Sequence, residues 1–453
     1  MKLIPFFGFA AIVPFVLSAA SAEDWSQFRG GLAMSVSAGE PLKASPNGAS
    51  VAWKTQLPGT GWSQPVVVGN KVFVTTAVSK TPDRPKGMMA GAMDPSTMGR
   101  APAPKDPLQW KLICLDIEKG NILWEQIVAE AIPKYGKHAS NTYATETPAA
   151  SNDAVYVWFG SVGAMAAYDH SGKPLWKKEL SVQKLSNDFG TGSSPVLYEG
   201  NLFVQLYNDE FAQLVCMDAR DGKTLWQADR SAGTAWSTPV LWMNNGAMEI
   251  VAAGKGMVIG YDPQTGSEKW RVGGLDTSFS CSVVADKSGL YMGTSSPGSR
   301  APIMAVAPGQ KGDLTLANGA ETSPAILWSN TKSGAGMPSP IVIGERLYFF
   351  GNTATCYNKR DGKELFRARL PGGTLAAGCP VAVGDTIYLI NESGKLLVMS
   401  ATSEFKVESE IQIGSADEVF WSTPAIANQS LLVRRSEERR VGKECRSRWS
   451  PYH

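Results

Sequence analysis

The residues of this chain that are best suited to chemistry gather in one polar segment, KYGKHASNTYATETP. It contains His138 and Glu146, an imidazole and a carboxyl, which are side-chain types that transfer protons in many enzymes. Asn141 and Tyr143 lie between them and could bind a ligand through hydrogen bonds. The same four residues would also suit a loop that is hydrogen-bonded within the protein and anchors the next strand. They are therefore candidates for the lining of a binding mouth, and we assign no catalytic residue.

A second polar loop and three tryptophans extend this candidate mouth. The loop contains Asn208 and Asp209, which are open to the same two interpretations. Trp62, Trp236 and Trp421 precede similar strand starts in GWSQP, AWSTP and FWSTP. Three indoles at one pore mouth could form a platform that stacks on a carbohydrate or contacts a partner. Packing between repeats is the other interpretation of these aromatic rings.

Motifs for common cofactors and metals are absent from the sequence. There is no G-x-G-x-x-G, P-loop, H-E-x-x-H or G-x-S-x-G motif, and no C-x-x-C-H haem site. We therefore expect no cofactor-binding residue and no metal ligand set. Two groups of cysteines share repeat positions, which indicates buried thiols in different repeats rather than disulfides. These groups are Cys114, Cys216 and Cys356, and Cys281 and Cys379.

One unit recurs along the chain and must position these residues. A small-x-Pro strand start leads to a second strand, then to a third strand that ends in Asp-x-x-x-Gly, and then to a strand with Trp. The clearest copy is GTAWSTPVLW…VIGYDPQTGSEKW, with Pro239, Asp262, Gly266 and Trp270 at these positions. An Asp side chain can accept bonds from turn N–H groups, and Gly tolerates a positive φ. The alternating apolar residues around each start predict β-strands.

Copies of this unit predict an all-β, eight-bladed β-propeller of four-stranded antiparallel blades, with seven blades as the alternative. The turns are Asp116…Gly120, Asp169…Gly172, Asp218…Gly222, Asp262…Gly266 and Asn358…Gly362. The strand starts are Pro65, Pro148, Pro195, Pro239, Ser282 (in place of Pro), Pro340, Pro380 and Pro424. Residues 51–57 contain Trp53 without a strand start, and residues 417–434 have a strand start without a turn or Trp. We expect the first segment to close the ring as the outermost strand of the last blade.

The two ends of the sequence differ from the repeat region. Residues 1–22 have a basic start, an apolar stretch and a small-x-small site, which predict an export signal cleaved after Ala22. Residues 435–453 read like a translated sequencing adapter and are expected to be non-native. The last blade then lacks its third strand, so we expect the 51–57/417–434 junction to be less stable than in a chain with the natural terminus. The predicted propeller domain is residues 23–434.

Charge and composition exclude some classes of function. The chain has 43 Lys and Arg against 41 Asp and Glu; without Lys2 and the tail, 36 remain against 38. This balance gives no bulk attraction for nucleic acid. Residues 79–109, rich in Met, Pro and Gly, predict a flexible insertion, with a Met-rich contact surface or soft-metal site as the alternative. We expect a periplasmic or secreted monomer with a protein partner and no membrane span.

The repeat pattern, most complete in MDARDGKTLW at residues 217–226, resembles the PQQ-like propeller repeats (PQQ is pyrroloquinoline quinone). The resemblance covers residues 25–434. The segments DWSQFRGG and NTYATETPAA are similar to a subgroup of exported bacterial proteins named after the outer-membrane assembly lipoprotein BamB. In the PQQ-like family, the aromatic residue of each blade docks against the next blade. The resemblance assigns this role to Trp53, Trp124, Trp176, Trp226, Trp270, Trp328 and Phe366.

The resemblance implies two different functions, because one fold can support several. Quinoprotein dehydrogenases of this fold hold PQQ and Ca²⁺ on the propeller axis, with an adjacent Cys-Cys disulfide, carboxylate and amide calcium ligands and a catalytic Asp. This chain has no adjacent Cys pair and no position that we can match to the calcium ligands. We therefore expect a non-enzymatic scaffold for protein–protein interactions in the cell envelope or outer-membrane assembly, without a cofactor. The alternatives are a PQQ- and calcium-dependent alcohol dehydrogenase and a small-molecule or glycan binder at the mouth.

Overall fold

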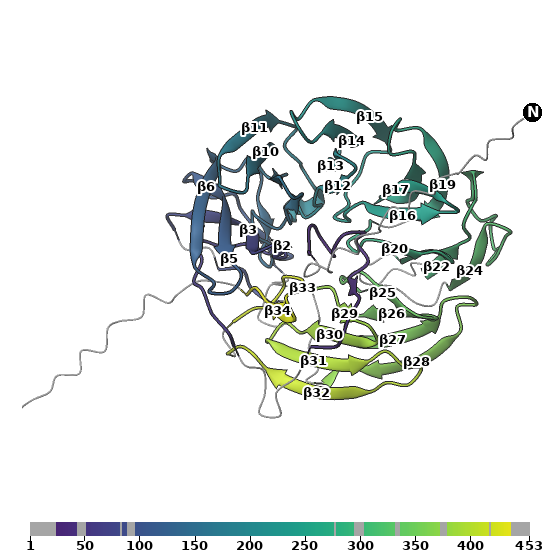
Figure 1. Cartoon of the computed structure of the whole chain (residues 1–453). Helices are drawn as coiled ribbons and strands as arrows, with labels where there is room; N and C mark the ends of the chain where they lie inside the picture. The colour runs from purple at the N-terminus through teal and green to yellow at the C-terminus, as the bar shows by residue number, and fades with distance from the viewer. Residues whose placement is uncertain are drawn as a thin grey trace, which may run out of the picture.

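The protein is a ring of antiparallel β-sheets around a central axis (Figure 1). The computed structural model describes residues 24–42, 51–81, 84–87, 96–275, 278–293, 303–330, 336–371, 378–415 and 418–435. The predicted signal, most of the adapter-like tail and part of the 79–109 insertion lie outside these residues. Within them there is no α-helix, only the short 3₁₀ helix η2 (Ser186–Asp188). No helix in these ranges is long and apolar enough to cross a membrane.

Three four-stranded sheets form the first part of the ring, each running from an inner strand at the axis to an outer strand at the rim. The first contains β2 (Val66–Val68), β3 (Lys71–Ser79), β5 (Leu108–Asp116) and β6 (Ile122–Ala131). The second contains β8 (Ala149–Ala150), β9 (Ala154–Phe159), β10 (Ala164–Asp169) and β11 (Pro174–Glu179). The third contains β12 (Val196–Tyr198), β13 (Asn201–Tyr207), β14 (Ala212–Asp218) and β15 (Thr224–Arg230).

Four further sheets continue the ring, two of them with an added parallel strand. The fourth contains β16 (Val240–Asn244), β17 (Ala247–Gly254), β18 (Gly256–Tyr261), β19 (Glu268–Leu275) and the added β23 (Gly312–Asp313). The fifth contains β20 (Val284–Asp286), β21 (Gly289–Gly293), β22 (Ile303–Val306) and β24 (Ile326–Asn330). The sixth contains β25 (Ile341–Ile343), β26 (Arg346–Phe350), β27 (Thr353–Asn358) and β28 (Glu364–Arg369). The seventh contains β29 (Val381–Val383), β30 (Thr386–Ile390), β31 (Lys395–Ser400), β32 (Val407–Gln412) and the added β1 (Val36–Ser37).

The last sheet has two strands, β33 (Ala425–Ala427) and β34 (Ser430–Leu432). A small separate sheet pairs β4 (Arg100–Ala101), in the 79–109 insertion, with β7 (Lys137–His138). The all-β propeller fold predicted from the sequence is confirmed. Seven of the eight expected strand starts are followed at once by the inner strand of one ring sheet, as Pro380 is by β29, and β20 begins two residues after Ser282.

A circle of hydrogen bonds joins the starts of the eight inner strands. In seven successive steps, the backbone N–H of one strand start donates to the side chain of the next strand start. The members in order are Gln64, Thr147, Ser194, Thr238, Ser282, Ser339, Cys379 and Thr423. The Gln64 amide closes the circle by donating to the carbonyl of Pro424. A small hydroxyl or thiol at seven of these positions, and the Gln64 amide at the eighth, therefore link neighbouring sheets.

This circle corrects two expectations about repeat positions. Ser282 was expected to replace a strand-start proline, but it is a member of the hydrogen-bond circle, so Val283 stands in the place of the proline. Cys281 and Cys379 were expected to be equivalent, but only Cys379 belongs to the circle. The thiol of Cys281 instead bonds the carbonyl of Gly293. The five cysteines in the described ranges are buried free thiols.

Tryptophans at the rim join neighbouring sheets, four of them on outer strands and Trp53 in residues 51–57, which were expected to form a strand but do not. Trp176 donates its indole N–H to the carbonyl of Ala219 at 2.9 Å, and its ring lies against Gly222 of the next turn. Gly222 has φ +72°, and a Cβ there would lie 2.8 Å from the ring, so the turn requires glycine for two reasons. The same pairing recurs four more times, in Trp53–Gly120, Trp124–Gly172, Trp226–Gly266 and Trp328–Gly362.

Trp270 does not dock in this way, contrary to expectation. Its indole N–H donates to the Glu249 carboxylate of its own sheet at 2.7 Å, and its ring is buried there. The reason is that the fifth sheet has no Asp-x-x-x-Gly turn between β22 and β24 to receive it. Trp242 makes the link instead, by donating to the carbonyl of Asp286 at 2.9 Å. Phe366 contacts the next sheet through the ring of Phe405, with centroids 5.7 Å apart.

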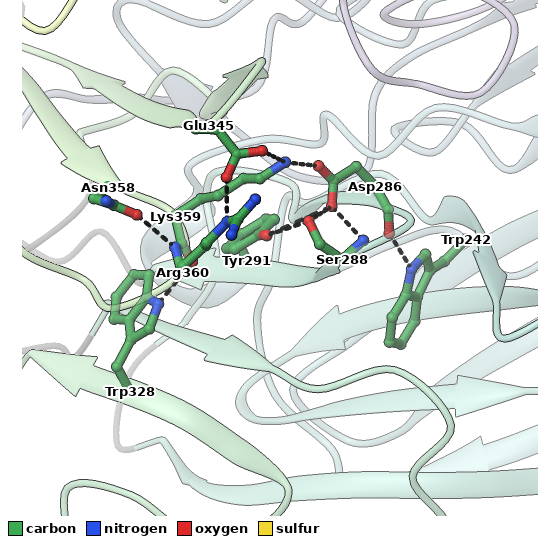
Figure 2. A network of polar contacts seen from close by, with 9 residues as sticks. All are labelled: Trp242, Asp286, Ser288, Tyr291, Trp328, Glu345, Asn358, Lys359 and Arg360. Atoms are coloured by element: carbon green, nitrogen blue, oxygen red, sulfur yellow. Dashed lines mark hydrogen bonds and ion pairs between the residues drawn. The ribbon is translucent and has the colours of Figure 1, made fainter.

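A network of charges ties the fifth sheet to the sixth (Figure 2). Lys359 is buried and donates to the Asp286 carboxylate at 2.6 Å, with Glu345 3.7 Å away. Ser288 also donates to Asp286. Burial alone would raise the pKa of Asp286, but the hydrogen bonds from Lys359 and Ser288 outweigh it and lower the pKa. Figure 2 shows Trp242 and Trp328 at the two ends of this network, so ionic and aromatic links act at one junction.

Candidate functional site

Most of the candidate mouth residues lie in segments that precede the inner strands, whereas Asn208 and Asp209 lie between β13 and β14. Trp236 donates its indole N–H to the carbonyl of Gly190 at 2.7 Å and stacks on Phe189, with centroids 6.4 Å apart. The ring of His138 contacts the same Phe189 ring edge-on, with the two centroids 5.0 Å apart. Asn141 donates to the carbonyl of Phe189 at 2.8 Å. Phe189, which the sequence analysis did not single out, therefore joins three of the predicted residues.

Trp62 and Trp421 form a second aromatic pair among the candidate mouth residues. Their ring centroids are 6.4 Å apart with an interplanar angle of 32°. Trp62 is only 5% exposed and donates its N–H to the carbonyl of Ser140 at 2.8 Å. Trp421 is half-buried. The ring of Trp62 is therefore packed inside the protein and offers no open face for stacking on a ligand.

Two of the predicted polar residues are anchors of the fold in this structure. Tyr143 is buried in the core between the first two sheets and donates its hydroxyl to the carbonyl of Tyr135. His138 bonds Ser140 through Nδ1 at 2.6 Å, and burial, with the nearby Lys137 ammonium, lowers the pKa of His138. The neutral imidazole is therefore favoured at physiological pH. His170 was expected to face solvent, but its ring is half-buried against Phe73, with centroids 5.3 Å apart.

Glu146 is the most perturbed carboxyl of the candidate set. It is 1% exposed and accepts a hydrogen bond from the Gly160 N–H at 3.1 Å. Burial raises the pKa of Glu146 to about 7, although the Thr191 hydroxyl and nearby N–H groups act in the opposite direction. Glu146 occupies the small position of its strand start, where the neighbouring repeats have Ser63 and Ser193. A carboxyl in this position can take up a proton near neutral pH without contact with solvent.

The second polar loop is hydrogen-bonded to its surroundings. Asp209 accepts hydrogen bonds from Ser186 at 2.9 Å and from Thr234 at 3.1 Å. Asn208 is buried and accepts a bond from the Glu210 N–H through its side chain. The side chain of Asp209 still lies at the surface. This loop can therefore present a carboxylate to a partner.

The axis of the ring is occupied by the N-terminal segment, residues 24–42, which Figure 1 shows inside the inner strands. Trp25 bonds Val67 of the first sheet through both backbone groups, at 2.9 Å each. Gln27 accepts from the N–H of Leu197 in the third sheet at 2.7 Å. β1 then pairs with β29 of the seventh sheet. A single short segment thus joins sheets on opposite sides of the axis.

Arg29 is the centre of this axial segment. Its side chain is 1% exposed, and its guanidinium donates to the carbonyls of Val283 at 3.1 Å and Pro340 at 2.6 Å. Nε donates to the Ser35 hydroxyl at 2.9 Å, and the backbone N–H donates to Gln64 of the hydrogen-bond circle. Burial lowers the pKa of Arg29, yet the group has hydrogen-bond acceptors around it. In the sequence, this segment contains DWSQFRGG, which is similar to the BamB-like subgroup but does not by itself indicate the contacts of Arg29.

The donor atoms in the described ranges do not match a calcium or transition-metal site. These residues contain no cluster of three or more His, Cys, Asp or Glu side chains able to hold a metal ion. The strand starts near the axis have hydroxyl, thiol and amide groups that already take part in the hydrogen-bond circle. Calcium in proteins prefers six to eight oxygen ligands, several of them carboxylates. The hydroxyl, thiol and amide groups at the axis therefore hold the sheets together through hydrogen bonds.

The sheet ring and the Asp-x-x-x-Gly/Trp repeat are those of a β-propeller. Residues 109–289 and 159–322 match the family described as "Outer membrane protein assembly factor BamB". The predicted resemblance to PQQ-like repeats is confirmed for this region.

Individual relatives include both an enzyme sequence and an enzyme structure. Polyvinylalcohol dehydrogenase from a Pseudomonas species is 23% identical over 265 residues, which are 49% of this chain and 35% of that enzyme. This chain thus matches about a third of the length of that curated relative. Quinohemoprotein alcohol dehydrogenase from Comamonas testosteroni has a TM-score of 0.61 at 12% identity, over 89% of this chain and 74% of that one. BamB from Moraxella catarrhalis has a TM-score of 0.47 at 13% identity, over 73% and 86%, and we base no argument on that likeness.

Proposed function

We propose that this protein is an exported propeller scaffold that binds other proteins in the cell envelope, and that it works without PQQ or calcium. The observation that carries this proposal is the axial segment. Residues 24–42 fill the axis, and the Arg29 guanidinium lies among carbonyls of the inner strands. A quinone cofactor and its calcium ion would have to displace these contacts. The hydrogen-bond circle offers them no carboxylate in exchange.

The rim of the ring offers apolar surface for partner proteins. Leu123, Leu175 and Leu225 occupy the same repeat position, directly before the docked tryptophan, on β6, β11 and β15. Their side chains are 47%, 48% and 51% exposed. These three outer strands are also edge strands with unpaired main-chain groups on one side. Exposed leucines on neighbouring edge strands favour contact with another protein.

A cross-linking experiment tests the scaffold function. A photo-reactive amino acid is placed at Leu175 or Leu225 in the full chain, expressed in its own cells, with Met243 as an exposed control position on an inner strand. We expect one defined cross-linked protein from the two rim positions and none from the control. Export of the protein also requires cleavage after Ala22, and N-terminal sequencing of the mature protein measures this. Absence of rim cross-links in native cells would contradict the scaffold proposal.

The alternative, a PQQ-dependent alcohol dehydrogenase, follows from the enzymes among the relatives. It is tested by adding PQQ and Ca²⁺ to the purified protein and following absorbance and dye-linked alcohol oxidation. We expect neither tight cofactor binding nor turnover. Turnover that depends on both additions would replace the scaffold proposal with the enzyme.

A further inference from the structure

Two loops extend from the same edge of the first sheet. The insertion at residues 79–109 connects β3 to β5, and residues 132–148 connect β6 to β8. The end of β3, the start of β5 and the end of β6 pair with one another at this edge. The second loop includes the candidate mouth residue His138. The described parts of both loops therefore lie on the mouth face of the ring, the face from which these loops project.

The described parts of the two loops are bonded to each other through their backbones. β4, in the insertion, pairs with β7 in the second loop. Ala139 donates its N–H to the carbonyl of Gly99 at 2.6 Å and accepts a hydrogen bond from the N–H of Lys86 at 2.8 Å. A Cβ on Gly136 would lie 2.3 Å from the carbonyl oxygen of Ala101, so the backbones approach closely. Residues 84–87, 96–105 and 132–140 therefore form one connected surface unit.

This unit has an excess of positive charge. It contains no Asp or Glu, and the insertion's two carboxylates, Asp83 and Asp94, lie outside the described residues. Even with both of them counted, the balance stays positive, whereas the chain without Lys2 and the tail has 36 Lys and Arg against 38 Asp and Glu. Lys137 is buried, with its ammonium over the ring of Tyr143. The exposed cations, which we call the basic patch, are Arg84, Lys86, Arg100, Lys105 and Lys134.

Exposed apolar side chains lie in the same unit. Met98, in the insertion, and Ile132, at the start of the second loop, are each 54% exposed. At the border of the unit, Arg100 donates to the side chain of Asn187 at 2.6 Å, and the carboxylate of Asp188 follows there. Cations beside exposed apolar side chains favour an anionic lipid surface, because headgroup phosphates attract the cations and the boundary with the acyl chains accepts the apolar groups.

We propose that the basic patch binds an anionic lipid surface, so that the mouth face of the ring is turned toward a membrane. The five cations contact headgroup phosphates, and Met98 and Ile132 enter the boundary between headgroups and acyl chains. These two apolar side chains favour lipid over an acidic protein segment, for which the charges alone would be enough. Contact of this kind is peripheral and reversible, since no segment of the unit spans the bilayer.

This inference is separate from the proposed scaffold function. The leucines that the cross-linking experiment examines lie on the outer strands β6, β11 and β15. Rim cross-links in a protein that does not bind vesicles would reject the basic patch alone. Vesicle binding without rim cross-links would keep the basic patch and reject the rim.

Vesicle binding by the full chain tests the basic patch. Co-sedimentation compares vesicles of phosphatidylcholine alone with vesicles that also contain about 30% phosphatidylglycerol, which is anionic. We expect binding to the anionic vesicles only, and its loss as NaCl is raised from about 50 mM to about 500 mM. Equal binding to both kinds of vesicle, or no binding to the anionic ones, would overturn the proposal.

A triple variant then connects binding to the basic patch. Arg84→Gln/Lys86→Gln/Lys134→Gln removes three exposed cations without adding negative charge. A Lys or Arg near an anionic surface contributes about fivefold in affinity, so this variant should bind the anionic vesicles about a hundredfold more weakly. Lys134→Gln alone should bind about fivefold more weakly, which keeps the test open if the triple variant does not fold.

The matched control removes the same charge from the opposite face of the ring. Arg220→Gln/Lys223→Gln/Arg360→Gln changes side chains that are 87%, 80% and 73% exposed. They lie in or beside the turns that end the third strands, and β5 shows that a third strand begins at the mouth face. Because the basic tail at residues 435–453 is the same in both variants, their difference reports the basic patch. We expect the control to weaken binding by less than about threefold, and equal losses in the two variants would overturn the proposal.

A second variant separates a lipid surface from an acidic protein. Met98→Ser/Ile132→Ser keeps every charge but removes the exposed apolar side chains, and it should bind the anionic vesicles about tenfold more weakly. If this variant binds the vesicles as well as the parent does, the lipid surface is rejected. A poly-glutamate peptide that then binds through Arg84, Lys86 and Lys134 would identify an acidic protein segment as the partner.

Discussion

At the scale of single residues, the polar groups of the mouth are hydrogen-bonded within the protein. Asn141 bonds the carbonyl of Phe189, His138 bonds Ser140, and Asp209 accepts from two hydroxyls. Glu146 differs, because its carboxyl is buried and titrates near neutral pH. The hydrogen bonds of His138 and Glu146 go to different partners, Ser140 and Gly160, so we treat the two residues separately.

Glu146 should make stability depend on pH. Its folded pKa, about 7, lies above the ordinary 4.5, so the folded state binds a proton that the unfolded state releases first. The free energy of unfolding is therefore highest below pH 4.5 and falls by about 3 kcal/mol in total as the pH rises toward 7. Glu146→Gln should remove this loss and be more stable than the parent at pH 8, with little difference at pH 4.5. Urea unfolding at both pH values measures this, and parallel pH profiles of the two proteins would contradict it.

Lys359 should contribute more to stability than its neighbour Arg360. The Lys359 side chain is 6% exposed and pairs with Asp286, which is 26% exposed. Lys359→Met leaves this partly buried carboxylate without its cation and should cost about 2–3 kcal/mol. Arg360→Met changes a side chain that is 73% exposed and should cost less than about 1 kcal/mol. Chemical denaturation compares them, and equal costs would show that burial does not set the strength of this network.

At the scale of elements, we expect the short axial segment, residues 24–42, to contribute strongly to the stability of the whole ring. It contacts sheets that are far apart in sequence, and Arg29 alone bonds two of them. Arg29→Met should cost about 3 kcal/mol, because the buried carbonyls of Val283 and Pro340 lose their donor. The control is Arg220→Met, since that side chain is 87% exposed. Thermal melting measures the difference, and similar melting of both variants would contradict a structural role for the axial segment.

The sequence predicted the elements better than it predicted the contacts between them. Period-2 alternation and the Asp-x-x-x-Gly turns depend on local physics, so the strands and their order could be found. The docking of Trp270 could not, because it depends on whether the following sheet offers a glycine turn. The hydrogen-bond circle also escaped notice, since a Ser, Thr, Gln or Cys before a strand start acquires its partner only from another repeat. Phe189 and Arg29 were missed for the same reason: their importance comes from residues distant in sequence.

At the scale of the whole molecule, the ring should not be equally stable all around. Among the residues that the structure describes, β33 and β34 form a two-stranded sheet, whereas the seven other sheets of the ring have four or five strands. Amides of β34 should therefore exchange at least about tenfold faster than those of β13, the second strand of the third sheet. Hydrogen exchange with mass spectrometry at neutral pH gives the comparison. Equal protection of β34 and β13 would contradict a weak junction at this point of the ring.

The axial segment also has a consequence for the order in which the protein folds. Residues 24–42 leave the ribosome early, but Arg29 reaches its acceptor on Pro340 only after 311 further residues are made. The Gln64 side-chain amide meets its acceptor later still, because Pro424 follows it by 360 residues. Contacts of such high sequence separation are formed slowly. Residues 24–42 thus remain without these native partners until the strand starts at Pro340 and Pro424 have been made.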